Sequence, residues 1–347
     1  MTDRPRTSWL IPALLGSAAA LGASALYAVS RAREAERRTP PIGDFITVDG
    51  VRLHYVERGQ GEALVLIHGN GTMIQDFLSS GLVEDLAQRF RVILIDRPGY
   101  GYSDRPRGVW TPRAHATLFQ KALQHLGVTQ AVVLGHSWGA LVAVALALQA
   151  PHLVHSLVLA SGYYYPTLWA DVVLASPSAI PILGDLLRHT VSPMVGRALL
   201  PAMIKGMFAP AAIPERFDRE FPTDMMLRPL QLRASAEDAA MMTPVTVELQ
   251  RHYRDLDLPV AVVVGGADQI ADVGRQSQRL HDELPNSTLI VVPGMGHMIH
   301  HLAPARVIEA VELASKQSPG RGRMKGAAMR VETWFLFDLD GTLVDSV

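Results

Sequence analysis

The sequence predicts an α/β fold with a mostly parallel β-sheet. Short apolar runs, which are typical of buried strands, alternate with segments of helical spacing through the middle of the 347-residue chain. Several of these runs end in glycine-rich turns that carry polar side chains. Because parallel neighbours in a sheet are joined by crossover helices, this alternation favours a sheet that is covered by helices.

The composition of the chain limits its partners and its chemistry. The formal net charge is −1 at pH 7, so no basic surface is available for a nucleic acid, and we expect no nucleic-acid partner. The chain contains no cysteine, which excludes disulfides, thiol catalysis and thiolate metal sites. Neither observation specifies an oligomeric state or a cellular compartment.

The N-terminal region contains an uncharged stretch, 9–30, that is rich in alanine and leucine. A helix of about 20 such residues is long enough to cross a bilayer. Arginines lie on both sides of the stretch, so they do not decide which side of the membrane the protein faces. We therefore expect 1–38 to be a membrane anchor with a basic flank. The alternative is a cleavable signal peptide, with small residues at 28–30 before the cut and an exported protein.

The elements of the folded domain, 39–316, follow in order. A hairpin comes first, because Asp49-Gly50 separates two short runs of β-forming residues, 45–48 and 51–56. Six further apolar runs are predicted as strands: 63–67, 91–95, 131–134, 157–160, 259–264 and 288–292. Three segments have helical spacing: 114–126, 140–150 and 304–315.

A serine-containing turn stands at the centre of this pattern. The sequence Gly135-His136-Ser137-Trp138-Gly139 lies between a predicted strand and a segment rich in alanine and leucine. In that context G-x-S-x-G predicts a nucleophile elbow, a tight turn that exposes the serine hydroxyl at the N-terminus of a helix. Ser137 is therefore the candidate nucleophile.

A serine hydroxyl needs a base that takes its proton and donors that hold the developing oxyanion. His297 follows a predicted strand on a glycine-rich turn, which suits a base that must reach Ser137. Asp268 follows the preceding strand and is placed to orient the imidazole. The backbone N–H groups of Asn70 and Trp138 are the candidate oxyanion donors.

These candidates have rivals nearby in the sequence. Asp272 is close enough to Asp268 to serve as the acid instead. His300 and His301 compete with His297, but the glycine-rich turn favours His297, and we expect the other two to face the insertion or solvent. The three histidines could in principle hold a metal ion. Because the sequence places no carboxylate or thiol beside them, we expect no metal ion and no cofactor.

Other polar residues in these motifs have predicted structural roles. We expect His68 to hold the loop that carries Asn70. Asp96 and Arg97, which end the strand 91–95, are expected to brace loops through an ion pair. His136, next to the candidate nucleophile, is expected to pack against its surroundings.

Between about 166 and 255 the strand pattern stops, and helical segments interrupted by prolines take over. This stretch predicts a helical insertion over the strand ends, whose methionines either fill a core or line an adaptable apolar pocket. Tyr163 and Tyr164, just before it, and Met298, next to His297, are candidate substrate contacts. Packing at an interface is the alternative for the tyrosines.

Together these motifs resemble the α/β-hydrolase fold superfamily. The sequence contains H-G at 68–69, D-R-P-G-Y-G-Y-S at 96–103, G-H-S-W-G at 135–139, G-x-x-D at 265–268 and G-x-G-H at 294–297, in the order of that superfamily. The resemblance covers most of 43–316. It implies an eight-stranded, mostly parallel sheet flanked by helices, with a helical lid after the sixth strand. It also implies a catalytic triad of Ser137, Asp268 and His297.

A serine at position 137 narrows the expected reaction. Relatives that open epoxides or displace halide resemble this chain around His68, but their nucleophile is an aspartate. We therefore expect hydrolysis of a carboxylic ester, or a related small apolar acyl compound, through an acyl-enzyme. Carbon–carbon bond hydrolysis and acyl transfer use the same triad and stay open, as does a non-catalytic binding protein of the same fold. A histidine base predicts that activity is lost below about pH 6.

The final segment, 317–347, contains a linker rich in glycine and basic residues and then an apolar run into Asp338-Leu339-Asp340-Gly341-Thr342. This D-x-D-G-T motif resembles the first motif of the haloacid dehalogenase superfamily of phosphatases. There Asp338 would be the nucleophile and Asp340 the acid/base, and both would help to hold Mg²⁺. The later motifs of that fold do not follow, so we expect an inactive, disordered stub.

Overall fold

The computed structural model describes residues 10–167, 180 and 182–316, so the predicted stub at 317–347 lies outside the described residues. At the centre is an eight-stranded sheet with the order β1-β2-β4-β3-β5-β6-β7-β8. The strands are β1 Asp44–Val48, β2 Val51–Arg58, β3 Glu62–Ile67, β4 Phe90–Ile95, β5 Ala131–His136, β6 Val154–Ala160, β7 Val260–Gly265 and β8 Ser287–Val292. The pairs β1–β2 and β2–β4 are antiparallel, and the remaining pairs are parallel. The predicted fold class is therefore confirmed.

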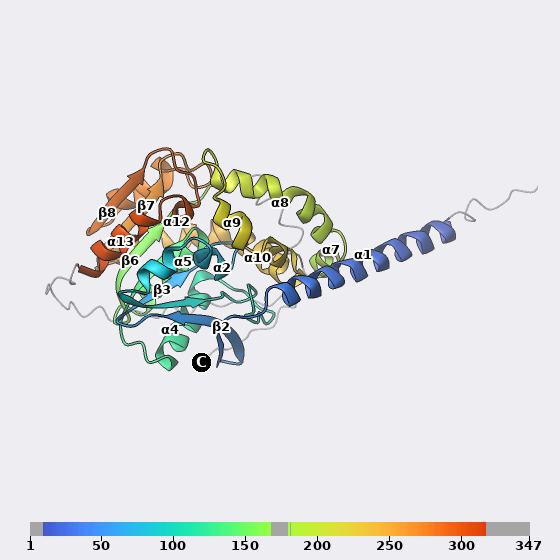
Figure 1. Cartoon of the computed structure of the whole chain (residues 1–347), viewed down its shortest axis with the longest axis horizontal. Coiled ribbons are helices and arrows are strands. Elements are labelled where there is room, and N and C mark those ends of the chain that lie inside the picture. The colour runs from blue at the N-terminus through green and yellow to red at the C-terminus, as the bar shows by residue number, and fades with distance from the viewer. Residues whose placement is uncertain (1–9, 168–179, 181, 317–347) are drawn as a thin grey trace, which may run out of the picture.

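The helices lie mainly in the connections between parallel strands. Their bounds are α1 Leu10–Arg38, α2 Gln75–Leu78, α3 Leu82–Leu86, α4 Pro112–His125, α5 Trp138–Gln149, α7 Leu183–His189, α8 Ser192–Phe208, α9 Glu215–Glu220, η2 Thr223–Leu227, α10 Pro229–Leu249, η3 Tyr253–Asp255, η4 Gly274–Gln278, α11 Arg279–Glu283, α12 Ile299–Leu302 and α13 Pro304–Lys316. Both faces of the sheet are covered by these helices (Figure 1).

The central strands are apolar throughout because helices bury both of their faces. Along β3, Val65 and Ile67 belong to the core that the sheet forms with α4 and α5. Leu64 and Leu66 point to the opposite face and belong to the core formed with α3 and α13. Each of these side chains is fully buried, which stabilises the fold by about 1.5–3 kcal/mol per side chain. The alternation also fixes the register of the strand.

A helical insertion joins β6 to β7, where the sequence predicts one. Its described elements are α7 to α10 with η2 and η3, while residues 168–179 and 181 lie outside the described range. A third apolar cluster, which includes Phe208, Phe217 and Met225, holds these helices against the loops at the strand ends. Other side chains of α8, such as Leu199 and Met203, are more than half exposed.

The first helix requires a correction to the sequence analysis. Within the described residues, none of the helices is both long enough and apolar enough to cross a membrane, so the predicted membrane anchor over 9–30 was wrong. Much of the apolar content of α1 comes from alanine, with glycine and serine between, and these residues gain little from burial in hydrocarbon. An uncharged stretch of sufficient length is therefore a weaker signal than a stretch of leucine or isoleucine.

The C-terminal half of α1 packs against the helical insertion, whereas its N-terminal half projects from the body of the molecule (Figure 1). Ala28 and Ala35 are buried in this contact. Ser24 Oγ donates a hydrogen bond of 2.6 Å to the Thr190 carbonyl, and Arg228 Nη1 pairs with Glu36 at 3.0 Å. The helix therefore joins a third layer, formed with α7 and η2, outside the sheet.

Candidate active site

Ser137 occupies a strained turn between β5 and α5. Its φ of 53° and ψ of −121° are unusual for a residue with a side chain, and such conformations cost about 1–3 kcal/mol. Two glycines make the turn possible. A Cβ atom at Gly135 would lie 2.4 Å from the Gly139 carbonyl oxygen, and a Cβ atom at Gly139 would lie 2.3 Å from the Ile67 carbonyl oxygen. The turn therefore packs against β3 with no space for a side chain at either position.

The structure brings together the three residues predicted as a triad. His297 Nε2 lies 2.9 Å from Ser137 Oγ, and His297 Nδ1 lies 2.8 Å from Asp268 Oδ2. The other carboxylate oxygen of Asp268 accepts backbone hydrogen bonds from Ile270 at 2.8 Å and Ala271 at 2.9 Å. Because an ionised carboxylate can only accept, Nδ1 of His297 carries a proton. The lone pair of Nε2 then faces the serine hydroxyl, which is the arrangement of a general base.

The rival residues have other partners. Asp272 is exposed, and its Oδ1 accepts a hydrogen bond of 2.8 Å from the Arg275 backbone, so it caps the turn into η4. His300 and His301 are both buried against Asp76. The ring of His301 also packs edge-on against Phe208 and Phe217, so His301 faces the helical insertion as we expected. Neither histidine faces solvent, because α12 begins two residues after His297 and turns both side chains inward.

The predicted oxyanion donors lie on both sides of Ser137. Trp138 is the first residue of α5, so its backbone N–H has no partner within the helix. On the opposite side, a Cβ atom at Gly69 would lie only 3.2 Å from Ser137 Cβ, which places the loop of Asn70 beside the nucleophile. The Asn70 side chain anchors this loop, since its Nδ2 donates to the Ser235 carbonyl at 3.2 Å and its Oδ1 lies 2.6 Å from Tyr100 Oη.

His68 holds the same loop from inside. Its Nε2 accepts the Arg97 backbone N–H at 3.0 Å, so its Nδ1 is the donor to the Gly69 carbonyl at 2.9 Å. Burial, together with the nearby Arg97 charge, lowers the pKa of His68 to about 4. The imidazole is therefore neutral at neutral pH, consistent with the structural role that the sequence analysis gives it.

A buried ion pair that the sequence analysis did not identify links this loop to the helical insertion. Arg97 Nη1 donates to Asp238 on α10 at 2.5 Å. The same guanidinium donates to the carbonyls of His68 at 3.0 Å and Gly69 at 2.8 Å. Asp96 has a different partner, since His54 Nδ1 lies 2.7 Å from its Oδ2. No local signal reveals Asp238, because it is 141 residues from Arg97 in the sequence.

The three candidate substrate contacts are buried. Tyr163 Oη donates to the Ile270 carbonyl at 2.7 Å, close to Asp268. The Tyr164 backbone N–H donates to Gln276 at 2.8 Å, which ties this segment to η4. Met298 is fully buried in the cluster beneath the helical insertion. These contacts describe packing roles, and substrate contact at these positions stays a prediction.

Comparisons with known proteins agree with this fold. Residues 62–304 match the family described as alpha/beta hydrolase fold. The chain is 30% identical over 285 residues to an uncharacterized protein of Mycobacterium tuberculosis strain H37Rv, with 79% of this chain and 81% of that protein covered. It is 27% identical over 275 residues to haloalkane dehalogenase 2 of Mycobacterium bovis, with 75% and 90% covered.

Among solved structures, a thermophilic esterase from Thermogutta terrifontis superposes with a TM-score of 0.63 at 23% identity. That comparison covers 78% of this chain and 97% of the esterase. Similarity at this level of identity supports a shared fold, whereas the family match over residues 62–304 is a match of the sequence itself. The chain therefore belongs to the α/β hydrolase fold family.

Proposed function

We propose that the protein is a serine hydrolase that cleaves a carboxylic ester, or a related acyl compound, through an acyl-enzyme. Ser137 is the nucleophile, His297 the general base and acid, and Asp268 the residue that orients the imidazole. The observation that carries the proposal is the hydrogen-bond chain from Asp268 through His297 to Ser137, with distances of 2.8 and 2.9 Å. Two backbone donors to Asp268 hold the carboxylate in place for this task.

The reaction follows from these positions. Ser137 Oγ attacks the acyl carbon as its proton moves to His297 Nε2, and the backbone N–H groups of Asn70 and Trp138 bind the oxyanion. The tetrahedral intermediate collapses when Nε2 protonates the leaving alcohol, which leaves an acyl group on Ser137. Water then repeats the sequence, with Nε2 as its base, and releases the acid.

The nucleophile distinguishes the proposed ester hydrolysis from the dehalogenation named for the relative haloalkane dehalogenase 2. In the haloalkane-dehalogenating relatives that the sequence analysis considers, the nucleophile is an aspartate, whereas this chain has Ser137 at the elbow. A serine hydroxyl forms an acyl-enzyme with a carbonyl substrate, and its release by water needs the oxyanion donors.

The surroundings of the oxyanion loop favour an apolar substrate. The methyl carbon of Met226 would lie 3.6 Å from a Cβ atom at Gly71, the residue next to Asn70. Met73 and Tyr100 are fully buried in the same cluster. A flexible thioether beside the loop can adapt to acyl chains of different shape. We therefore infer a small or medium apolar acyl group.

The test is hydrolysis of p-nitrophenyl esters of increasing acyl length by the full chain. We expect activity that Ser137→Ala abolishes, and labelling of Ser137 by a fluorophosphonate probe. Ser277→Ala is the control, because Ser277 is a buried serine whose hydroxyl has no hydrogen-bond partner in the described structure. Labelling without ester hydrolysis would point to carbon–carbon bond hydrolysis or acyl transfer. Failure of both would favour a non-catalytic binding protein and contradict the proposal.

A further inference from the structure

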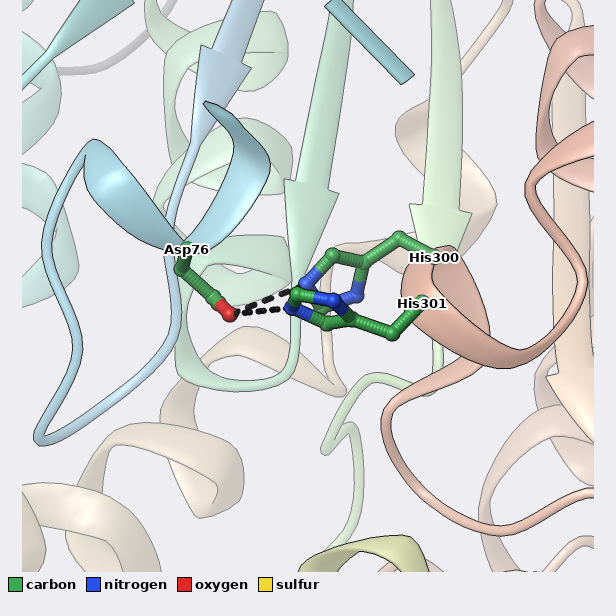
Figure 2. Close-up of side chains that lie close together, drawn as sticks. All are labelled: Asp76, His300 and His301. Carbon is green, nitrogen blue, oxygen red and sulfur yellow. Dashed lines mark hydrogen bonds and ion pairs between the residues drawn. The ribbon is translucent and has the colours of Figure 1, made fainter. Parts of the chain in front are cut away.

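A second cluster of titratable side chains lies behind the candidate active site. Asp76 on α2 and the adjacent residues His300 and His301 on α12 point toward one another (Figure 2). One carboxylate oxygen, Asp76 Oδ1, lies 2.8 Å from His301 Nε2 and 3.2 Å from His300 Nε2. All three side chains are at most 1% exposed.

Hydrogen bonding within the protein does not satisfy this cluster. Among the described residues, Asp76 Oδ2 has no hydrogen-bond partner, and neither ring nitrogen of His300 has one in suitable geometry. His300 Nε2 is close to the carboxylate, but its direction does not fit a hydrogen bond. Buried polar atoms without partners cost about 1–3 kcal/mol each, and they often indicate an ion or water.

We propose that Asp76, His300 and His301 bind a divalent transition-metal ion, with Zn²⁺ as the best match. Two imidazoles and one carboxylate are a common zinc ligand set. Tetrahedral ligands with bonds of about 2.0–2.1 Å lie about 3.3 Å apart, so the observed spacings of 2.8 and 3.2 Å need to change little. The three candidate ligand atoms all lie within 4.8 Å of one another.

The unpaired carboxylate oxygen fits the rest of the coordination. With one ligand atom from each side chain, a water molecule would take the fourth tetrahedral position, and Asp76 Oδ2, which has no partner among the described residues, is free to accept a hydrogen bond from it. Binding at Nε2 leaves the Nδ1 atom of each histidine protonated, because a metal-bound imidazole is neutral. The sequence analysis expected no metal because it placed no carboxylate beside these histidines. The fold supplies one from 225 residues away.

An ion bound at this position would have a structural role. The helix α2 follows the loop of Asn70, and α12 follows His297, so an ion would cross-link the two segments that flank Ser137. His136 lies between, with ring centroids 4.3 Å from His300 and 5.1 Å from His297. Because the cluster is buried, we expect the metal to enter during folding and to exchange slowly.

The test measures metal in the untagged full chain. We expect the chain refolded with Zn²⁺ to retain one ion after dialysis, and the chain refolded with Co²⁺ to show the visible absorption of tetrahedral nitrogen and oxygen ligation. Asp76→Asn and His301→Gln should each weaken binding by about 100-fold or more. His54→Gln is the matched control, since His54 and Asp96 form a buried pair at 2.7 Å that is not part of a three-residue group.

The wild-type spectrum keeps the proposal falsifiable if a variant fails to fold. A refolded wild-type chain that retains no zinc and gives no tetrahedral cobalt spectrum would overturn it, as would full metal retention in both variants. The proposal is also independent of the serine hydrolase mechanism. A metal-loaded chain should still react with the fluorophosphonate probe at Ser137, and loss of labelling on loading would place the ion at His297 and refute the site.

Discussion

Asp238→Asn is expected to destabilise the protein far more than loss of a surface ion pair. Asp238 is fully buried and accepts hydrogen bonds from Arg97, from Arg105 at 3.0 Å and from Tyr100 at 2.8 Å. Burial alone would raise the pKa of Asp238, but the charges of Arg97 and Arg105 outweigh it and hold the pKa below its usual value. The carboxylate is therefore ionised and neutralises two buried guanidinium groups.

The size of the effect follows from what remains after the substitution. Arg105 keeps Glu237 at 2.8 Å, whereas Asp238 is the single carboxylate paired with Arg97 among the described residues. Leaving one buried charge without its partner costs about 3–5 kcal/mol. For a domain of this size, 1 kcal/mol shifts the melting temperature by about 2–4 °C, so a decrease of roughly 6–20 °C is expected.

The assay is urea and thermal unfolding of the full chain, followed by circular dichroism. Glu309→Gln is the control, because the Arg306–Glu309 pair of 2.5 Å is about half exposed and should change stability by less than about 0.5 kcal/mol. Arg97 also holds the carbonyls of His68 and Gly69, so the rate of ester hydrolysis should fall as well. A destabilisation by Asp238→Asn that equals that of the control would refute the reasoning.

Three further predictions concern the serine elbow, the stability of the fold at acidic pH and the triad. Gly139→Ala should prevent folding or lower the free energy of unfolding by several kcal/mol, because the new Cβ atom would lie 2.3 Å from the Ile67 carbonyl oxygen. The control Gly206→Ala, whose Cβ atom would have nothing within 4 Å, should leave stability in urea unfolding unchanged or slightly raise it. Equal effects of the two variants would exclude the steric argument. Burial lowers the pKa of His115 to about 3, so the unfolded state binds a proton below pH 6.5 that the folded state does not. His115 alone should therefore lower the free energy of unfolding by about 2 kcal/mol between pH 7 and pH 5, and His115→Phe should remove that loss. If the free energy of unfolding of the variant changed with pH as steeply as that of the wild type, the prediction would be wrong. Asp268→Asn should lower kcat by about 10,000-fold while Asp272→Asn leaves it unchanged, and the reverse result in ester hydrolysis would make Asp272 the acid.

The sequence predicts those features whose signals are local. The period of the apolar runs identifies the strands, and the glycine spacing around Ser137 identifies the elbow, since the whole motif lies within five neighbouring residues. The positions of Asp268 and His297 also follow, because the carboxyl ends of parallel strands meet at one edge of the sheet.

Pairings between distant segments could not be predicted in the same way. Arg97 pairs with Asp238 across 141 residues, and Asp76 meets His301 across 225 residues. The chemistry of each residue was visible in the sequence, but its partner depends on how α10 and α12 pack. The error at α1 has a different cause, because length and lack of charge predict a membrane span only when the side chains are apolar enough.

The hydrogen-bond chain from Ser137 to His297 also has a consequence for biosynthesis. The two residues are 160 positions apart, so at about 5–20 residues per second a ribosome needs roughly 8–30 s to add the second after the first. Until β7 and β8 are made, late in that interval, the edge of β6 is unpaired. The emerging chain thus exposes its serine elbow without a base, and a probe that requires the complete triad would report the moment at which the last strand joins the sheet.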